Sequence, residues 1–324
     1  MLQVIQKKFA RFFVRRARFV MSMDRAREIE HRFRGREEYR RLQLADHVVV
    51  SYPKGGRTWL RTMISRYYQL VYDLPESAFL NFDNLHRRDA RVPRVFFTHD
   101  SYVRKFTGNI DSKRDFYDKN VLMLMRNPRD VAVSQFFQWR YRMRPRKVAL
   151  NHYPDRSQDL QIFDFVLNED VGLPAIITWM NSWYVARPEL ERHFIVRYED
   201  LRARPEETFG PVMGFLGEAV RPEWVADAVN YGSIDNMRSM ERRNYFWASG
   251  SRLAPRDKAN PDSYKVRRAK VGGYRDYFDD EQLAVLDSMV RERLDPEIGY
   301  HEKDETAAPE TSGETAAQQV VAKL

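Results

Sequence analysis

A lysine, two glycines and a hydroxyl residue stand close together in the first fifth of the chain, directly after a short apolar run. The run HVVVSY ends at Tyr52 and leads into PKGGRTW. Gly55 and Gly56 allow the backbone to approach an anion closely, and a helix that begins after them presents free N–H groups to it. Lys54 adds charge and Thr58 adds a hydroxyl. The pattern predicts a phosphate-binding loop between a strand and a helix.

The order of these residues differs from that of nucleoside triphosphatases. Their Walker A loop places the lysine after the last glycine, and a Mg²⁺-binding hydroxyl follows that lysine. Here Lys54 precedes both glycines, and Arg57 separates them from Thr58. We therefore expect phosphate binding without a metal ion. Trp59 follows as a residue that can stack on a nucleobase.

A second candidate phosphate site follows a later apolar run, VLMLM. Asn127 and Pro128 give a strong helix-start signal, an N-cap residue followed by proline at the first helical position. Arg126 then lies at the end of a predicted strand, and Ser134 lies within two turns of the helix. We expect both to bind one phosphate, the arginine through its charge and the serine through its hydroxyl.

These motifs follow apolar runs that alternate with helical patterns. Short strands buried on both faces and separated by helices indicate a parallel sheet covered by helices on both sides. The predicted fold class is therefore α/β, a single domain with a central parallel β-sheet and a P-loop-like strand–loop–helix unit. In such sheets, ligands bind beyond the carboxyl ends of the strands. The predicted strands are 47–52, 95–99, 121–126 and 194–198, and the predicted helices lie near 57–71, 128–141, 173–186, 206–217, 222–230 and 281–294.

The composition limits the class of protein. The 324 residues include 55 Lys+Arg against 46 Asp+Glu, a formal net charge of +9, and 13% are aromatic. This aromatic content allows a buried core and excludes disorder over the whole length. The lack of cysteine excludes disulfides, thiol nucleophiles and cysteine metal sites, and it favours a cytoplasmic location. The positive charge leaves a phosphorylated small molecule, nucleic acid and an anionic membrane as candidate partners.

We divide the chain into three parts. Residues 1–36 form a predicted basic amphipathic helix, because six basic residues precede the first acidic residue, Asp24, among apolar residues at mostly helical spacing. This helix either lies on an anionic membrane surface or docks on the protein's own core. Charges interrupt its apolar run, so we expect no signal peptide. Residues 37–301 form the main domain, and residues 302–324 form a predicted disordered tail.

Several motifs, in order over roughly residues 45–295, resemble those of sulfotransferases that use 3′-phosphoadenosine 5′-phosphosulfate (PAPS) as donor. Residues 52–59 resemble the family's phosphosulfate loop, and residues 126–134 resemble its 3′-phosphate motif almost residue for residue. Residues 267–274, RRAKVGGY, resemble the C-terminal motif that clamps the same phosphate. Thr98-His99 matches the pair that holds the catalytic base.

Two further motifs match the adenine side of the family's donor site. Tyr198-Glu199-Asp200 resembles the Tyr-Glu-Asp whose tyrosine contacts adenine, and Ser233-Ile234 resembles the Ser-Phe beside it. The resemblance implies that His99 takes the acceptor proton, that Lys54 stabilises charge on the bridging oxygen and that Thr58 holds the 5′-phosphate. The donor-binding residues implied in this way are Lys54, Gly55, Gly56, Arg57, Thr58, Trp59, Arg126, Ser134, Tyr198, Ser233, Ile234, Arg267, Arg268 and Ala269.

The sequence departs from the family pattern at several positions. Arg57 stands where the family usually has a small hydroxyl residue, and Phe97 replaces a lysine that precedes Thr-His in many cytosolic members. Ala269 replaces a glycine of the clamp, and Gly273-Tyr274 replaces Asp-Trp. The family's short dimerisation signature is not recognisable near residues 275–284. The lost lysine puts a second cation at the sulfuryl group in doubt.

The acceptor is less clear from the sequence than the donor. The basic N-terminal segment and a basic insert at 142–159, a candidate acceptor lid, favour an amphiphilic or anionic hydroxyl compound, such as a lipid or glycolipid, met at the inner face of a membrane. Nucleic acid is not an expected partner. Two other function classes stay open, a P-loop kinase and a non-catalytic basic binder of membranes or nucleic acid. The candidate pocket walls are Phe79, Phe82, Tyr102, Phe106, Phe136, Phe137, Trp139 and Tyr141, of which we expect at least half to be core.

Overall fold

A computed structural model describes residues 23–245 and 257–301 of the chain. The basic segment at 1–22 and the predicted tail at 302–324 lie outside the described residues. The predicted helix at 1–36 is therefore described only in its last part. That part belongs to α2, Met23–Leu44, which continues past the boundary that the sequence suggested at residue 36.

A four-stranded parallel sheet forms the centre of the molecule, with strand order β2-β1-β3-β4. The register pairs Val50 of β1 with Thr98 of β2, and Ser51 of β1 with Leu124 of β3. The carboxyl ends of these strands therefore lie at one edge. The finding confirms the predicted α/β class, and each strand ends one residue before its predicted end. The strands are β1 His47–Ser51, β2 Val95–Thr98, β3 Asn120–Met125 and β4 Arg192–Arg197.

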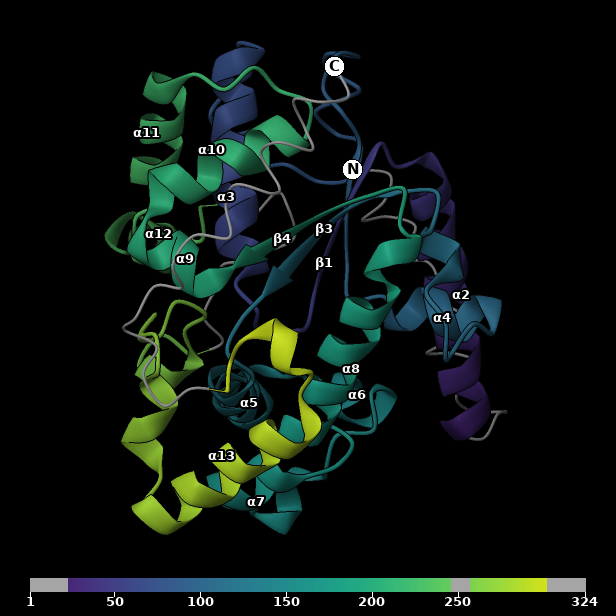
Figure 1. Cartoon of the computed structure of the whole chain (residues 1–324), viewed down its shortest axis with the longest axis vertical. Coiled ribbons are helices and arrows are strands. Elements are labelled where there is room, and N and C mark those ends of the chain that lie inside the picture. Colours follow the sequence, from purple (N-terminus) through teal and green to yellow (C-terminus); the bar gives the residue numbers. More distant parts are fainter. Residues whose placement is uncertain (1–22, 246–256, 302–324) are drawn as a thin grey trace.

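Helices cover both faces of the sheet, which explains the near-continuous valine run of β1 (Figure 1). Val48 and Val50 belong to one hydrophobic cluster, shared with α5, α8 and α13. Val49 points to the opposite cluster, shared with α3, α10 and α11. These six helices are α3 Arg57–Val71, α5 Pro128–Phe137, α8 Leu173–Ala186, α10 Pro205–Phe215, α11 Pro222–Tyr231 and α13 Asp280–Arg293.

Five short helices were not expected from the sequence. Each has between six and nine residues, too few for a helical period to stand out from chance. The helix expected near 128–141 is also divided, because α5 ends at Phe137 and a π-helix, Gln138–Arg142, continues it. The short helices are α4 Ser101–Thr107, α6 Pro145–Leu150, α7 Ile162–Leu167, α9 Tyr198–Ala203 and α12 Ile234–Arg242.

The N-terminal helix α2 packs closely on α4, the helix that follows β2. Gly35 makes this approach possible, since a Cβ there would lie 2.4 Å from Cβ of Phe106 and 2.7 Å from the carbonyl oxygen of Tyr102. Thr98 donates a hydrogen bond of 3.1 Å to Glu38 of α2. The described part of the N-terminal region is thus docked on the protein's own core.

Substitution Gly35→Ala should push α2 away from α4. Overpacking of this kind typically costs about 1–3 kcal/mol, and chemical denaturation should show that loss in the free energy of unfolding. Gly210→Ala in α10 is the matched control, because its Cβ would meet only Val220 at 3.5 Å, an ordinary contact. Equal stability of the two variants would contradict the close packing of α2.

Candidate functional site

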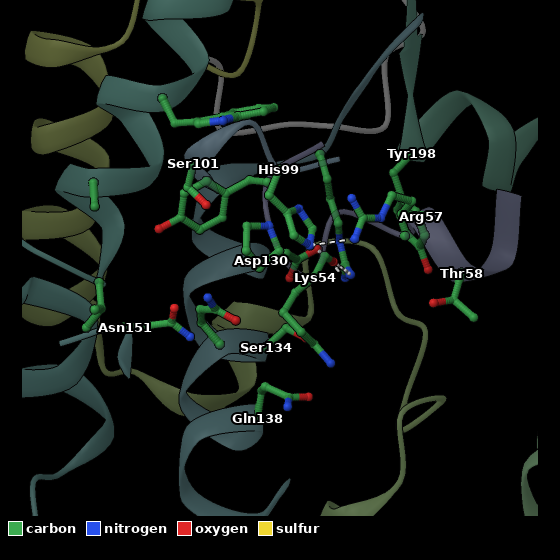
Figure 2. A pocket seen from close by; sticks show the side chains of 18 of the residues that line it. Lys54, Arg57, Thr58, His99, Ser101, Asp130, Ser134, Gln138, Asn151 and Tyr198 are labelled. Carbon is green, nitrogen blue, oxygen red and sulfur yellow. Dashed lines mark hydrogen bonds and ion pairs between the residues drawn. The ribbon is translucent and has the colours of Figure 1, made fainter. Parts of the chain in front are cut away.

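A cavity of about 1040 Å³ opens at the carboxyl edge of the sheet. The loops after all four strands line it, together with a segment near the C-terminal end of the main domain. Figure 2 shows His99, Arg57 and Lys54 between two groups of side chains, Thr58 and Tyr198 on one side and Ser101 and Asn151 on the other. The arrangement divides the cavity into two halves that meet at His99.

The loop between β1 and α3 brings backbone and charge to the first half. Lys54 and Gly56 both have left-handed backbone conformations, with φ of 76° and 95°. Gly56 is the N-cap of α3 and supplies no side-chain cap, so the first N–H groups of the helix are open to an anion. A Cβ at Gly56 would lie 2.6 Å from the ring of Tyr198, so glycine is required by contact as well as by φ.

Lys54 carries an amino group whose charge is easily lost. Burial, followed by the positive charges of Arg142 and Arg126, lowers the pKa of Lys54 to about 7. An anion beside the amino group would favour the protonated form. The guanidinium of Arg126 also donates a 3.3 Å hydrogen bond to the Lys54 carbonyl, which joins the loop after β3 to the loop after β1.

His99 lies directly after β2, and both of its ring nitrogens have partners. Nδ1 is 2.5 Å from the Ser51 carbonyl oxygen, and Nε2 is 2.8 Å from the Arg57 guanidinium (Figure 2). A carbonyl only accepts and a guanidinium only donates, so Nδ1 carries the proton and Nε2 presents its lone pair. Burial, followed by the charge of Arg57, holds the pKa of His99 well below its ordinary value. The lowered pKa favours the neutral form of the ring.

Asp100 fixes the backbone next to His99. It is fully buried with φ of 64°, a conformation that an aspartate adopts more readily than most residues. Its carboxylate accepts 2.6 Å and 2.9 Å bonds from Lys113 and the indole of Trp183, and Arg104 lies 3.2 Å away. These contacts hold the start of α4 and so orient His99.

The loop between β3 and α5 supplies the second group of cations. Asn127 caps α5 by accepting from the Arg129 N–H at 2.9 Å, and Pro128 is the first helical residue. The Arg126 guanidinium lies over the Tyr198 ring at 4.2 Å and 3.5 Å from Asp130. Ser134 lines the same cavity. The two residues of the predicted pair, Arg126 and Ser134, are thus both accessible from this cavity.

Asp130 joins this loop to the C-terminal segment. Its two carboxylate oxygens each accept a 3.0 Å bond from a backbone N–H, one from Gly272 and one from Tyr274. Asp130 was not among the site residues expected from the sequence, although it lies within the motif at 126–134. An acid four residues after an arginine, at the start of a helix, was the available signal.

The C-terminal segment also lines the cavity, through Arg267, Arg268 and Ala269. Arg267 stacks on the Phe137 ring at 3.7 Å, and Arg268 pairs with Asp276 at 2.7 Å on the surface. Ala269, where the family has glycine, adopts φ of 54°. The positive φ explains why glycine is preferred at this position.

The remaining predicted residues divide into two groups. Trp59 and Ile234 line the cavity, and the Trp59 indole donates a 2.7 Å bond to the Gly232 carbonyl. Gly55 and Ser233 are not part of the lining. Gly55 closes the loop by donating to the Tyr52 carbonyl at 3.1 Å, and Ser233 is the N-cap of α12.

The second half of the cavity differs from the walls that the sequence suggested. Tyr102 is the one suggested wall residue that lines it among the described residues. Phe79, Phe82 and Trp139 are buried in the core, and Trp139 stacks on Phe165 at 4.9 Å. The insert at 142–159, suggested as a lid, contributes Lys147, Asn151 and Tyr153 to the lining. The side chains that sequence reasoning missed come from α2, α4, α8 and the segments beside them. They include His31, Arg34, Arg104, Lys105, Ile110, Thr178, Trp179 and Ser182.

Residues 23–245 and 257–301 contain neither a cluster of metal-binding side chains nor a membrane-spanning helix. No group of three or more acidic or histidine side chains there could hold a metal ion. No helix within the same ranges has both the length and the apolar character needed to cross a bilayer.

Comparison with known proteins gives a consistent set of matches. The family model described as a sulfotransferase domain matches residues 44–296. The chain is 24% identical to the 3-alpha-hydroxysteroid sulfotransferase of Cavia porcellus over 288 residues, which cover 86% of this chain and 90% of that protein. It is 23% identical to human sulfotransferase 2A1, with 77% and 84% covered.

Solved structures show the same fold. Retinol dehydratase in complex with retinol and PAP matches with a TM-score of 0.52 and 16% identity, and 82% of this chain and 83% of that one are covered. A mouse sulfotransferase complexed with PAP matches with a TM-score of 0.50 and 21% identity, with 77% and 84% covered.

Substitution Asp130→Asn should loosen the turn at Gly272–Tyr274, because an amide NH₂ would then face one of the two backbone N–H groups. A hydrogen bond to a charged group stabilises by about 1.5–3 kcal/mol, so amide exchange at residues 272 and 274 should accelerate roughly tenfold or more. Hydrogen exchange measured by NMR or mass spectrometry checks this. Asp276→Asn is the control, since Asp276 pairs with the side chains of Arg268 and Lys270. Unchanged protection in Asp130→Asn would contradict the role of Asp130.

Proposed function

The chain belongs to the sulfotransferase domain family, and from this premise we propose that it transfers the sulfuryl group of PAPS to a hydroxyl of an acceptor. One observation carries the proposal. The open N-terminus of α3 with Lys54 and a second group of cations, Arg126, Arg267 and Arg268, line one cavity together with His99. A donor with phosphate groups at both its 5′ and 3′ positions requires such a pair of sites.

The residues present fit this donor. The α3 N-terminus with Lys54 and Thr58 forms the proposed 5′-phosphosulfate site, where free N–H groups and a hydroxyl bind oxygen atoms. The proposed 3′-phosphate site consists of Arg126, Ser134, Arg267 and Arg268, and the proposed adenine contacts are Trp59, Tyr198 and Ile234. The two solved structures described above are complexes with PAP, which supports the same donor class here.

The proposed chemistry assigns each step to a group of this chain. Nε2 of His99 accepts the proton of the acceptor hydroxyl while the hydroxyl oxygen bonds to sulfur. The bond between sulfur and the 5′-phosphate oxygen breaks in the same displacement, and Lys54 stabilises the charge that this oxygen gains. The products are the sulfate ester, PAP and a protonated His99, which returns its proton to solvent.

We propose an amphiphilic or anionic acceptor, because the second half of the cavity combines cations with apolar surface. Lys105 and the half-exposed Ile110 line it. His31 and Arg34 of α2, the helix that follows the basic segment 1–22 in the sequence, line it too. Relatives named for steroids, and one bound to retinol, act on or bind compounds of mixed apolar and polar character. We place contact with an anionic membrane in residues 1–22.

A nucleotide series should separate the donor from that of a kinase. PAP should raise the melting temperature more than AMP, which lacks the 3′-phosphate, and more than ATP with Mg²⁺. A ligand present at 100-fold its Kd stabilises by about 2.7 kcal/mol, a shift that differential scanning fluorimetry resolves. Stronger stabilisation by ATP with Mg²⁺ would favour the kinase class. Equal effects of all the nucleotides would favour a non-catalytic basic binder.

Substitution His99→Ala should remove the base and lower kcat by about 10²-fold or more, while the Kd for PAP changes little. The assay uses radiolabelled PAPS with an acceptor found by screening hydroxyl compounds. His193→Ala is the control, because His193 is exposed on β4 and lies outside the cavity lining. Retained turnover in His99→Ala would place the base elsewhere.

Removal of residues 1–22 should weaken binding to vesicles that contain anionic lipid and leave the Kd for PAP unchanged. Each basic residue near such a surface contributes about 1 kcal/mol, so the loss should exceed tenfold and diminish with added salt. Deletion of the whole of 1–36 is less informative, because it removes part of α2. A triple variant, Lys7→Glu, Lys8→Glu and Arg11→Glu, should behave like the truncation. Undiminished vesicle binding in both variants would contradict the membrane role.

A further inference from the structure

Arg57 is the departure from the family pattern that lies closest to the proposed base. It is the first residue of α3, and its guanidinium is 2.8 Å from Nε2 of His99. The other ring nitrogen, Nδ1, faces the Ser51 carbonyl at 2.5 Å. Nε2 is therefore the atom available to take a proton, and its single lone pair is occupied by Arg57. An acceptor hydroxyl needs that same lone pair.

The position of Arg57 offers a second partner for its guanidinium. Arg57 lies at the open N-terminus of α3 and lines the cavity beside Lys54 and Thr58. A guanidinium presents N–H groups in a planar fork that matches two oxygens of a sulfate or phosphate group. An anion also attracts the guanidinium through its full negative charge, which a neutral imidazole lacks. An anion at this loop would attract Arg57 away from His99.

No cation is provided at the position where many relatives carry a lysine. That position holds Phe97 on β2, and the guanidinium of Arg61 lies 3.9 Å from its ring centre. Phe97 packs with the hydrophobic cluster of α3 and α10. A positive charge for the sulfuryl group must therefore come from another residue, and Arg57 is the cation that already contacts His99.

We propose that Arg57 moves between two partners: without donor it binds Nε2 of His99, and with PAPS it binds the sulfuryl oxygens and frees Nε2 for the acceptor. This inference rests on the proposed function. The movement of Arg57 frees Nε2 of His99 only after the donor has bound. The acceptor hydroxyl is therefore deprotonated only when a sulfuryl group is present to bond with its oxygen. The covalent changes are those of the proposed transfer, with Arg57 as the added cation at sulfur.

The charges around His99 affect the pKa of its ring. Lys147 of α6 and Lys265 of the C-terminal segment add to the effect of Arg57, and the three cations favour the neutral ring. Two carboxylates lie near the end of β2, where His99 is found. Asp100 is the next residue in the chain, and Glu38 of α2 accepts a hydrogen bond from the Thr98 hydroxyl. Burial raises the pKa of Glu38, which weakens it as a counter-charge. Loss of Arg57 should therefore raise the pKa of His99 toward its ordinary value.

The test follows the His99 ring directly by NMR of ¹⁵N-histidine-labelled protein, which requires no acceptor. Addition of PAPS should shift the Nε2 resonance toward that of a neutral nitrogen without a hydrogen-bond donor. PAP, which lacks the sulfuryl group, should shift it much less. The variant Arg57→Thr restores the residue that is usual in the family. Its Nε2 resonance should already be that of a nitrogen without the Arg57 bond, so PAPS should shift it little further. The pKa of His99 should rise in this variant.

Affinities complete the test. The Kd for PAPS should increase roughly tenfold in Arg57→Thr, in line with the loss of a charged hydrogen bond, and the Kd for PAP should increase less. Arg57→Lys keeps the charge without the fork and should retain part of the preference for PAPS. Arg66→Gln is the matched control, since Arg66 lies on α3 outside the cavity lining and pairs with Asp227 at 2.5 Å.

The outcomes separate the two proposals. If neither PAP nor PAPS binds, the proposed function fails. If both bind, but PAPS and PAP shift Nε2 equally and Arg57→Thr weakens them equally, the donor site stands and the movement of Arg57 is wrong.

Discussion

The parallel register of β1 with its two neighbours is the constraint on which the site depends. Val50 pairs with Thr98, and Ser51 pairs with Leu124, so β2 and β3 end within one residue of the end of β1. The Ser51 carbonyl, no longer needed by the ladder to β2, then accepts from Nδ1 of His99. A shift of one residue in β2 would send that histidine to the other face. The tautomer of the proposed base is therefore determined by strand pairing.

Buried carboxylates hold the cationic loops in place. Asp130 binds two backbone N–H groups of the C-terminal segment, and Glu199 accepts from the Asn127 N–H at 2.9 Å. Glu241, fully buried, accepts from the N–H groups of Lys265 and Val266 at 2.6 Å and 2.9 Å. Each acid orients backbone near the cavity and offsets the repulsion between neighbouring arginines. This pattern explains how so many positive charges can surround one cavity in a stable fold.

Much of the fold could be predicted, because its main elements have strong periods. α3 and α8 match their predicted bounds, since long apolar faces and clear start signals define them. The acceptor walls could not be predicted in the same way. The π-helix at 138–142 inserts an extra residue into its turn, which directs Trp139 into the core. The hydrogen bond between Arg57 and His99 depends on the side-chain rotamers of two residues that are 42 positions apart in the chain. No local pattern reports such a contact.

The environment of Lys54 links occupancy of the site to the proton concentration of the surroundings. With its pKa near 7, the empty site holds a mixture of charged and neutral amino groups at neutral pH. An anion that binds beside Lys54 selects the charged form, so complex formation takes up a fraction of a proton from the buffer. Below pH 7 the affinity is nearly constant, and above it the affinity falls by up to about tenfold for each pH unit, until the pKa of the occupied site is reached. The loop proposed to hold the donor would thus also make the protein sensitive to alkalinity.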